Sequence, residues 1–211
     1  MTQKVAVVDY GMGNLRSVVK ALEHVADKAA EVVLTDSPEV IARADRVVFP
    51  GQGAARDCMA ALRDTGMDEV VREAAASKPF LGICMGMQVL MTRSEENGGT
   101  DLLGLYPGAV TRFEEWIDGE HYKVPQMGWN TVRQTQSHPL FEGIPDNSYF
   151  YFVHSYHVDP EDPSLMAGET EYGVAFASAI ARDNVFAIQC HPEKSADSGL
   201  RLLKNFIHWD G

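Results

Sequence analysis

The sequence has little of three features that would each place it in a special class of protein. It contains only three cysteines, none of them paired at the spacing of zinc ligands, which argues against a disulfide framework and against a zinc site. It lacks a long hydrophobic run, since the longest apolar stretch, residues 79–91, is interrupted by glycine and polar side chains and is too short to span a bilayer. It also lacks an excess of positive charge.

The charge balance is strongly acidic, with 18 lysines and arginines against 30 aspartates and glutamates and a formal net charge of -12. Such a surface repels polyanions, so we expect no binding to nucleic acid or to an anionic membrane. The first residues lead directly into an apolar run rather than into a secretory signal. Together with the unpaired cysteines, this predicts a reducing, cytoplasmic location.

Short apolar segments alternate with helix-like segments in the first half of the chain. Residues 4–10, 31–35, 46–49 and 79–83 predict strands, and residues 15–25, 54–76 and 85–93 predict helices. Ser37 followed by Pro38 is typical of the start of a further helix. Strands that are apolar throughout and alternate with helices are typical of a parallel sheet covered on both faces.

The segment 104–178 has a different character. It is rich in aromatic residues, glycine and proline, and its short alternating runs at 109–113 and 149–156 predict antiparallel strands. The first pattern returns at the end of the chain, with a strand at 185–190 and then an amphipathic helix. The predicted fold is therefore α/β, a mostly parallel sheet flanked by helices with a β-rich insertion, in one domain over residues 1–211.

Cys84 follows the strand at 79–83 and lies between Gly82 and Gly86. This spacing is typical of a sharp turn from strand to helix that carries a nucleophile, because small neighbours relieve crowding around a strained backbone. The turn would expose the thiol at the carboxyl edge of the sheet and at a helix N-terminus, which favours a thiolate. A buried structural cysteine is the alternative, and the flanking glycines favour the nucleophile.

A thiolate nucleophile needs a partner that accepts and returns a proton. His191 ends the last predicted strand, in a segment that the following proline keeps extended. Residues two apart in an extended segment project to the same side, so Glu193 can fix the tautomer of His191, while Cys190 points into the core. His154 and His157 remain the alternative bases.

The runs GICMG at 82–86 and HPEKS at 191–195 resemble those of the class I glutamine amidotransferases. This resemblance implies a triad of Cys84 as nucleophile, His191 as base and Glu193 as the residue that orients it. It also implies that glutamine is hydrolysed to glutamate and ammonia without a metal or an organic cofactor, and that residues 1–211 form a single amidotransferase domain.

The same resemblance implies an oxyanion site. The family's oxyanion strand corresponds to residues 50–53, so backbone amides near Gly51 and Gln52 would join that of Met85 in binding the tetrahedral oxyanion. Such donors each contribute about 3 kcal/mol in the transition state. Because Gly51 and Gly53 tolerate positive φ, we hypothesise that a peptide of this loop flips when a partner or ligand binds.

The glutamine-binding residues also follow from the resemblance. Gln88, one helical turn after the nucleophile, matches the family's glutamine-binding residue. Glu96 would hold the amino group of the substrate. The backbone around Ser155 and Tyr156 would hold its carboxylate end.

Two further motifs, DYGMGNLRS at 9–17 and MGWN at 127–130, resemble the glutaminase subunits of imidazole glycerol phosphate synthases. The resemblance implies a heterodimer with a cyclase subunit, a (β/α)8 barrel that must receive ammonia directly, because ammonium has no lone pair with which to attack. The implied docking residues are Asn14, Trp129, Tyr151 and Lys194. Trp129 and Tyr151 could equally be core aromatics.

Two other interpretations stay open. The chain could serve a different synthase, such as pyridoxal phosphate synthase, or it could be a non-catalytic scaffolding subunit that keeps the fold. Gln126 departs from the histidine that many relatives carry before MGWN, and Cys190 departs from a common aromatic residue before the catalytic histidine. We expect the first departure to affect contact with the partner and the second to alter packing only.

Overall fold

The computed structural model describes residues 2–211, in which the first strands form a parallel sheet. β1 (Gln3–Val8) lies between β2 (Ala30–Thr35) and β3 (Arg46–Gly51). β3 pairs in parallel with β4 (Phe80–Cys84), and β4 pairs with β15 (Val185–Ile188) from near the end of the chain. The carboxyl ends of β3, β4 and β15 therefore meet at one edge of the sheet.

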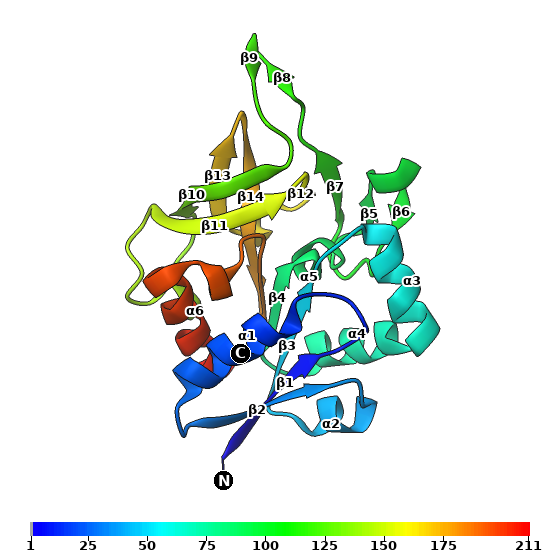
Figure 1. Cartoon of the computed structure of the whole chain (residues 1–211), viewed down its shortest axis with the longest axis vertical. Helices are drawn as coiled ribbons and strands as arrows, with labels where there is room; N and C mark the ends of the chain where they lie inside the picture. Colours follow the sequence, from blue (N-terminus) through cyan, green and yellow to red (C-terminus); the bar gives the residue numbers. More distant parts are fainter. Residues whose placement is uncertain (1) are drawn as a thin grey trace.

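Helices cover both faces of this parallel sheet (Figure 1). Side chains alternate along β1, so Val5 and Val7 pack into one core cluster while Ala6 and Val8 pack into the other. No helix within residues 2–211 is both long and apolar enough to cross a membrane. One helical layer consists of α1 (Leu15–Ala26) and α6 (Ala196–His208), and the other of α2 (Pro38–Arg43), α3 (Ala55–Thr65) and α4 (Met67–Ser77).

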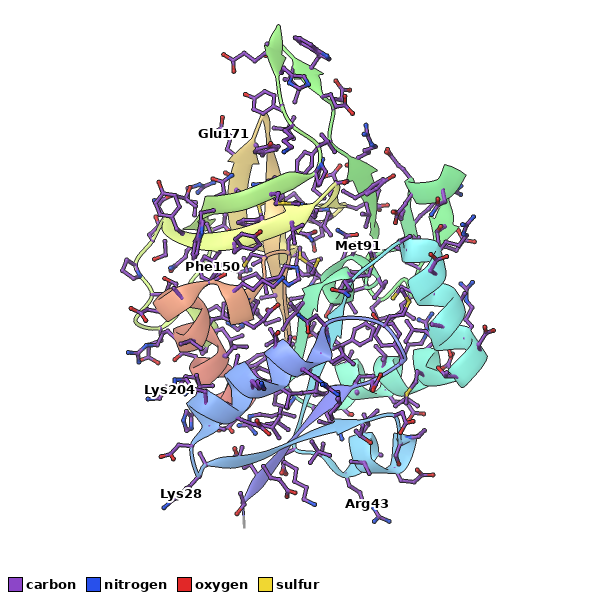
Figure 2. All side chains as sticks on the ribbon, viewed as in Figure 1. Lys28, Arg43, Met91, Phe150, Glu171 and Lys204 are labelled. Atoms are coloured by element: carbon purple, nitrogen blue, oxygen red, sulfur yellow. The ribbon has the colours of Figure 1, made fainter. Side chains whose placement is uncertain are left out.

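The sheet continues beyond β15 as a mainly antiparallel region that begins with β14 (Val174–Arg182). The hairpin of β8 (Trp116–Ile117) and β9 (Glu120–His121) projects beyond it (Figure 1). Phe150 of β11 lies inside the molecule, whereas Lys204 of α6 points outward (Figure 2). The predicted α/β fold with a β-rich insertion is confirmed.

The remaining strands and the 3-10 turns complete the fold. The strands are β5 (Arg93–Ser94), β6 (Thr100–Asp101), β7 (Gly108–Arg112), β10 (Gln126–Gln134), β11 (Ser148–His154), β12 (Tyr156–Pro160) and β13 (Met166–Tyr172). The 3-10 turns are η1 (Glu96–Gly98), η2 (Pro139–Phe141), η3 (Pro163–Leu165) and η4 (Pro192–Lys194).

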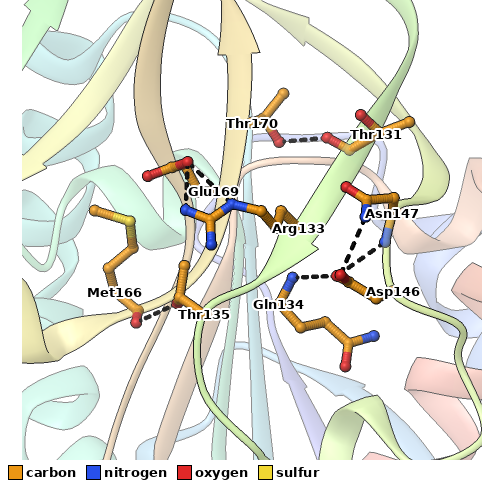
Figure 3. A network of polar contacts seen from close by, with 9 residues as sticks. All are labelled: Thr131, Arg133, Gln134, Thr135, Asp146, Asn147, Met166, Glu169 and Thr170. Atoms are coloured by element: carbon orange, nitrogen blue, oxygen red, sulfur yellow. Dashed lines mark hydrogen bonds and ion pairs between the residues drawn. The ribbon is translucent and has the colours of Figure 1, made fainter.

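Polar contacts hold β10 against β13 in this region (Figure 3). The Arg133 guanidinium donates to the Glu169 carboxylate, with Nη2 2.6 Å from Oε1. The Thr170 hydroxyl donates to the Thr131 carbonyl oxygen at 2.9 Å. Because the backbone ladder between the two strands is short, these side chains help to fix how β10 crosses the sheet.

The helix predicted at 54–76 is two helices. Gly66 separates α3 from α4 with a φ of 69°, a left-handed conformation that glycine adopts without strain. Its amide donates to the Arg63 carbonyl oxygen and so closes α3. Both helices bury apolar side chains in the same core cluster, which explains why the apolar pattern continues across the break.

The helix predicted at 85–93 is a single turn, α5 (Met85–Gln88). The carbonyl groups after α5 accept hydrogen bonds from a later loop instead of from a continuing helix. The Leu103 amide donates to the Val89 carbonyl oxygen at 2.9 Å, and the Tyr106 amide donates to the Leu90 carbonyl oxygen at 3.0 Å. Cys84 lies at a helix N-terminus as predicted, but the helix is shorter than predicted. The macrodipole sums over aligned peptides, so its single turn offers less positive charge to a thiolate than a longer helix would.

Candidate active site

A cleft of about 640 Å³ opens at the carboxyl edge of β3, β4 and β15. Open α/β sheets bind their ligands at this edge. A smaller cavity beside it is lined by Asn14, Gly51 and Glu193. The fold therefore gathers the predicted residues from distant parts of the chain. Those that line the larger cleft are Gln52, Cys84, Met85, Gln88, Glu96, Ser155, Tyr156, His191 and Lys194.

Cys84 lies at the turn from β4 to α5, with a φ of 55° and a ψ of -110°. This conformation is strained for a residue with a side chain. A Cβ on Gly82 would lie 2.6 Å from the Gly86 carbonyl oxygen, and a Cβ on Gly86 would collide with the Phe49 carbonyl oxygen. Both glycines are required by close packing, and the predicted elbow is confirmed.

His191 is paired with a buried carboxylate. Its Nδ1 lies 2.8 Å from Oε1 of Glu193, whose side chain is only 3% exposed. Burial lowers the pKa of His191, but hydrogen bonds with Cys84 and Glu193 together outweigh burial and raise that pKa to about 10. The two residues meet through the turn η4 rather than through the extended segment that we expected. The arrangement can keep a proton between the imidazole and the sulfur.

The alternative bases lie beside Phe113, with His154 buried and His157 half-buried. Burial lowers the pKa of His154 to about 4, and its Nδ1 lies 2.7 Å from the Tyr156 carbonyl oxygen. Burial also lowers the pKa of His157. Burial therefore favours the neutral form of both imidazoles, in contrast to the raised pKa of His191. Cys190 is fully buried in the core, as expected, and burial raises its pKa well above the usual value.

The predicted oxyanion residues lie around the nucleophile. The register of β3 against β4 places Gly51 directly beside Cys84. Met85 is the first residue of α5, so its backbone amide has no acceptor within the helix. Gln52 is exposed at the cleft. The predicted oxyanion residues therefore lie next to Cys84 at the same edge of the sheet.

The two positions of this loop, Gly51 and Gly53, need glycine for different reasons. Gly53 has a φ of 92°, which favours glycine. Gly51 is outside the positive-φ region, and a Cβ there would lie 2.6 Å from the Tyr10 hydroxyl oxygen and 2.9 Å from Cβ of Met85. Gly51 is therefore required by crowding, and the hypothesis of a loop that flips about both glycines fits Gly53 alone.

The predicted substrate-binding side chains are already oriented by the protein. Gln88 donates from Nε2 to the Tyr156 carbonyl oxygen at 3.0 Å and to Oε1 of Gln189 at 2.9 Å. Gln88 also lines the cleft. Oε2 of Glu96 accepts from the Ala55 amide at 2.6 Å, which links Glu96 to the start of α3 and places its negative charge at the cleft.

Sequence reasoning missed two residues that support the site. Gln189 is fully buried, and its Nε2 lies 3.6 Å from the Cys84 sulfur. Ser195 accepts from the Tyr151 amide at 2.9 Å and donates to the His191 carbonyl oxygen at 2.6 Å. The signal for Gln189 was a polar side chain in the apolar strand predicted at 185–190. Ser195 lies between η4 and α6, within the HPEKS run itself.

Three of the predicted docking residues cluster at the rim of the cleft. Trp129 is 52% exposed, and its ring centroid lies 6.1 Å from that of Tyr151. Lys194 places its ammonium group 5.9 Å from the Tyr151 ring centroid. Asn14 is exposed at the start of α1, beside the small cavity that Lys194 also lines. Trp129 is therefore not a core aromatic, and Tyr151 is only half-buried.

A comparison with protein families matches residues 6–209 to the family described as "Glutamine amidotransferase class-I". The chain belongs to this amidotransferase family. Solved structures have the same fold as this class-I amidotransferase. PurLQS from Thermotoga maritima matches with a TM-score of 0.73 over 99% of both chains at 17% identity. A second structure, titled a glutamine amidotransferase, matches with a TM-score of 0.70 over 97% of this chain and 99% of the other, at 18% identity.

Curated relatives of this amidotransferase share more than half of its sequence. It is 57% identical to the imidazole glycerol phosphate synthase subunit HisH of Pseudomonas putida over 211 residues, which cover 99% of each chain. It is 58% identical to the subunit of the same name from Aromatoleum aromaticum, over 97% of this chain and 98% of the relative. The similarity is end to end, so it covers every residue of the candidate site.

Proposed function

We propose that this chain is the glutaminase subunit of an imidazole glycerol phosphate synthase. It hydrolyses L-glutamine and passes the ammonia to a cyclase subunit, which forms imidazole glycerol phosphate in histidine biosynthesis. The observation that carries the proposal is the 57% identity, over 99% of both chains, to a curated subunit of that synthase. The whole chain then acts as one amidotransferase domain, since the family match spans residues 6–209.

The chemistry begins with the Cys84 thiolate and a protonated His191. The sulfur attacks the side-chain amide carbon of glutamine and forms a carbon–sulfur bond, and the carbonyl oxygen becomes an oxyanion. Backbone amides of Met85, Gly51 and Gln52 stabilise that charge. As the tetrahedral intermediate collapses, His191 gives its proton to the leaving nitrogen, and ammonia departs.

The second half of the reaction regenerates the enzyme. His191, now neutral, takes a proton from water, and the hydroxide attacks the thioester carbon. The carbon–sulfur bond breaks, glutamate leaves, and Cys84 returns as a thiolate beside protonated His191. Glu193 holds the imidazole in one orientation throughout, because its carboxylate is buried 2.8 Å from Nδ1.

The remaining polar groups hold the substrate and the partner. The Gln88 carbonyl oxygen accepts from the substrate amide, Glu96 binds its ammonium group, and backbone at Ser155 and Tyr156 receives its carboxylate end. The rim cluster of Trp129, Tyr151 and Lys194, together with Asn14, docks the cyclase. An exposed tryptophan next to a half-buried tyrosine is typical of an interface centre. Direct docking also protects ammonia from protonation by water.

A titration tests this function. The purified chain is mixed with increasing cyclase and its nucleotide substrate, and both glutamate and imidazole glycerol phosphate are measured. We expect glutamate and imidazole glycerol phosphate to form in equal amounts once the cyclase is in excess. Glutamate formation without any imidazole glycerol phosphate would point to a different synthase. Productive assembly with pyridoxal phosphate synthase would establish that alternative, which the end-to-end identity disfavours.

A non-catalytic scaffolding role makes a different prediction. It requires no reactive thiol, whereas this chain places Cys84, His191 and Glu193 in contact or in adjoining cavities. If Cys84→Ala and the unmodified chain give the same glutamate production in the assembled synthase, the scaffolding role is correct.

A further inference from the structure

Gln189 lies directly beside the nucleophile. β15 runs parallel to β4, and Ile188 is paired with Ile83. The residues that follow these two, Gln189 and Cys84, therefore lie side by side. Gln189 is fully buried, and its backbone amide donates to the Ser178 carbonyl oxygen at 2.8 Å. The side chain is therefore held at the carboxyl edge of the sheet without access to solvent.

The hydrogen-bond network decides which end of the Gln189 amide faces the sulfur. The Tyr156 carbonyl oxygen can only accept, so the Gln88 group that contacts it at 3.0 Å must be the amino group. The same amino group lies 2.9 Å from Gln189, so the Gln189 atom at that contact must be its oxygen. The Gln189 amino group then faces the Cys84 sulfur at 3.6 Å, as a donor.

We propose that Gln189 is a further catalytic residue, which donates a hydrogen bond to the Cys84 sulfur and stabilises the thiolate. The inference rests on the proposed function, because it takes Cys84 as the nucleophile. A hydrogen bond to an anion is stronger than one to a neutral group, so the donor favours the thiolate over the thiol. The same bond stabilises the sulfur when it leaves the thioester.

This role fills a gap in the electrostatics of the site. α5 is a single turn, so it contributes less positive charge at the sulfur than a longer helix would. His191 is one stabilising neighbour, and Gln189 is a second, neutral one that does not change its charge during the reaction. Its oxygen also orients Gln88, so one side chain connects the nucleophile with the residue that receives the substrate amide.

Two substitutions separate these roles. Gln189→Glu keeps an acceptor for Gln88 but lacks the N–H group that faces the sulfur. Gln189→Met has similar length and removes both contacts. Ser178→Ala is the matched control, since Ser178 is fully buried next to Gln189 along the ladder, and its hydroxyl has no hydrogen-bond partner in the described residues 2–211.

The measurement is the rate at which iodoacetamide alkylates Cys84 as a function of pH, followed by mass spectrometry of the Cys84 peptide. Cys58 and Cys190 have no exposed surface, whereas Cys84 is 7% exposed and lines the cleft, so the other two cysteines serve as internal references. We expect Gln189→Met to raise the apparent pKa of alkylation by about one unit, and Gln189→Glu to raise it further because a carboxylate there also repels the thiolate. Ser178→Ala should leave the apparent pKa unchanged. KM for glutamine should rise in Gln189→Met more than in Gln189→Glu.

Unchanged alkylation profiles in both folded Gln189 variants would overturn the proposal. If neither variant folds, the side-chain amide signal of Gln189 is followed by NMR in the unmodified protein. It should shift as Cys84 titrates and stay constant in Cys84→Ala, and a signal that ignores the titration would equally overturn it. If Cys84 of the unmodified protein is unreactive and glutamine is not hydrolysed, the proposed function itself has failed.

Discussion

The His191 imidazole and the Glu193 carboxylate form a pair, with Nδ1 2.8 Å from Oε1 and the Glu193 side chain 3% exposed. The pair explains how a histidine in a buried position keeps a proton. Burial alone would lower its pKa, whereas the hydrogen bonds with Cys84 and Glu193 raise it to about 10. This raised pKa favours a protonated imidazole beside the Cys84 sulfur near neutral pH.

Glu193→Gln should lower the pKa of His191, because the charged imidazole loses its anionic partner while burial stays the same. We expect kcat for glutamine hydrolysis to fall by about a hundredfold or more. NMR titration of the imidazole checks the pKa, and a glutaminase assay checks the rate. A pKa that stays near 10 in the variant would show that Cys84 alone holds the proton.

The same pair affects stability above neutral pH. A histidine with a folded-state pKa of about 10 and an unfolded value of 6.5 contributes stability that is complete below pH 6.5 and is lost as pH rises towards 10. Chemical denaturation at pH 6.5 and pH 9.5 should therefore show a smaller pH-dependent loss in Glu193→Gln than in the unmodified chain. Equal losses in the two proteins would contradict this linkage.

His154 should make the protein sensitive to acid. Its pKa is lowered by burial to about 4, so the unfolded chain binds a proton more readily between pH 6.5 and pH 4. Stability is complete above pH 6.5 and falls by about 3 kcal/mol on acidification to pH 4. Denaturation of His154→Gln should show a correspondingly flatter profile across this range. A profile as steep as that of the unmodified chain would exclude His154 as the cause.

Strain at Cys84 can be measured with a pair of inactive variants. Its φ of 55° and ψ of -110° suit glycine better than alanine. Relief of strain of about 1–3 kcal/mol should exceed the entropic disadvantage of glycine in the unfolded chain. Cys84→Gly should therefore melt at a higher temperature than Cys84→Ala. The reverse order would show that the turn is not strained.

Glu96 should act on substrate binding. Glu96→Gln removes the negative charge at the cleft but keeps an oxygen for the Ala55 amide. KM for glutamine should rise by about tenfold or more, with a much smaller effect on kcat, because a charge-assisted contact with the ammonium group is lost. Steady-state kinetics separate the two constants. A fall in kcat at constant KM would place Glu96 in the chemical step instead.

Trp129→Ala should weaken binding of the cyclase by about 2 kcal/mol while leaving the melting temperature unchanged, because the side chain is 52% exposed. Calorimetric titration with the cyclase measures the affinity. Leu34→Ala is the matched control, since Leu34 is an exposed apolar residue on β2, at the far edge of the sheet. Equal effects of the two substitutions would remove Trp129 from the interface.

Local signals made much of the structure predictable. The glycines around Cys84 indicated the elbow, and Ser37 caps α2 as expected, accepting from the Val40 amide at 3.4 Å. The pairing of His191 with Glu193 also depends on close spacing. Such features are decided within a few residues, so the sequence contains their cause.

Features set by distant segments were not predictable. α5 ends after one turn because the amides of residues 103–106 bond the carbonyls that follow it. Gln189 reaches Cys84 only through the register of β15 against β4. Glu96 meets the Ala55 amide across 41 residues of chain. In each case the partner is chosen by tertiary packing, for which neither spacing nor composition carries a signal.

The most direct test of the account uses Cys84→Ala in the assembled synthase. Imidazole glycerol phosphate formation is measured once with glutamine and once with a high concentration of ammonium salt as the nitrogen source. The account predicts that the glutamine-dependent reaction is lost while the ammonia-dependent reaction of the cyclase persists. Continued glutamine-dependent formation by Cys84→Ala would contradict the assignment of Cys84 as the nucleophile.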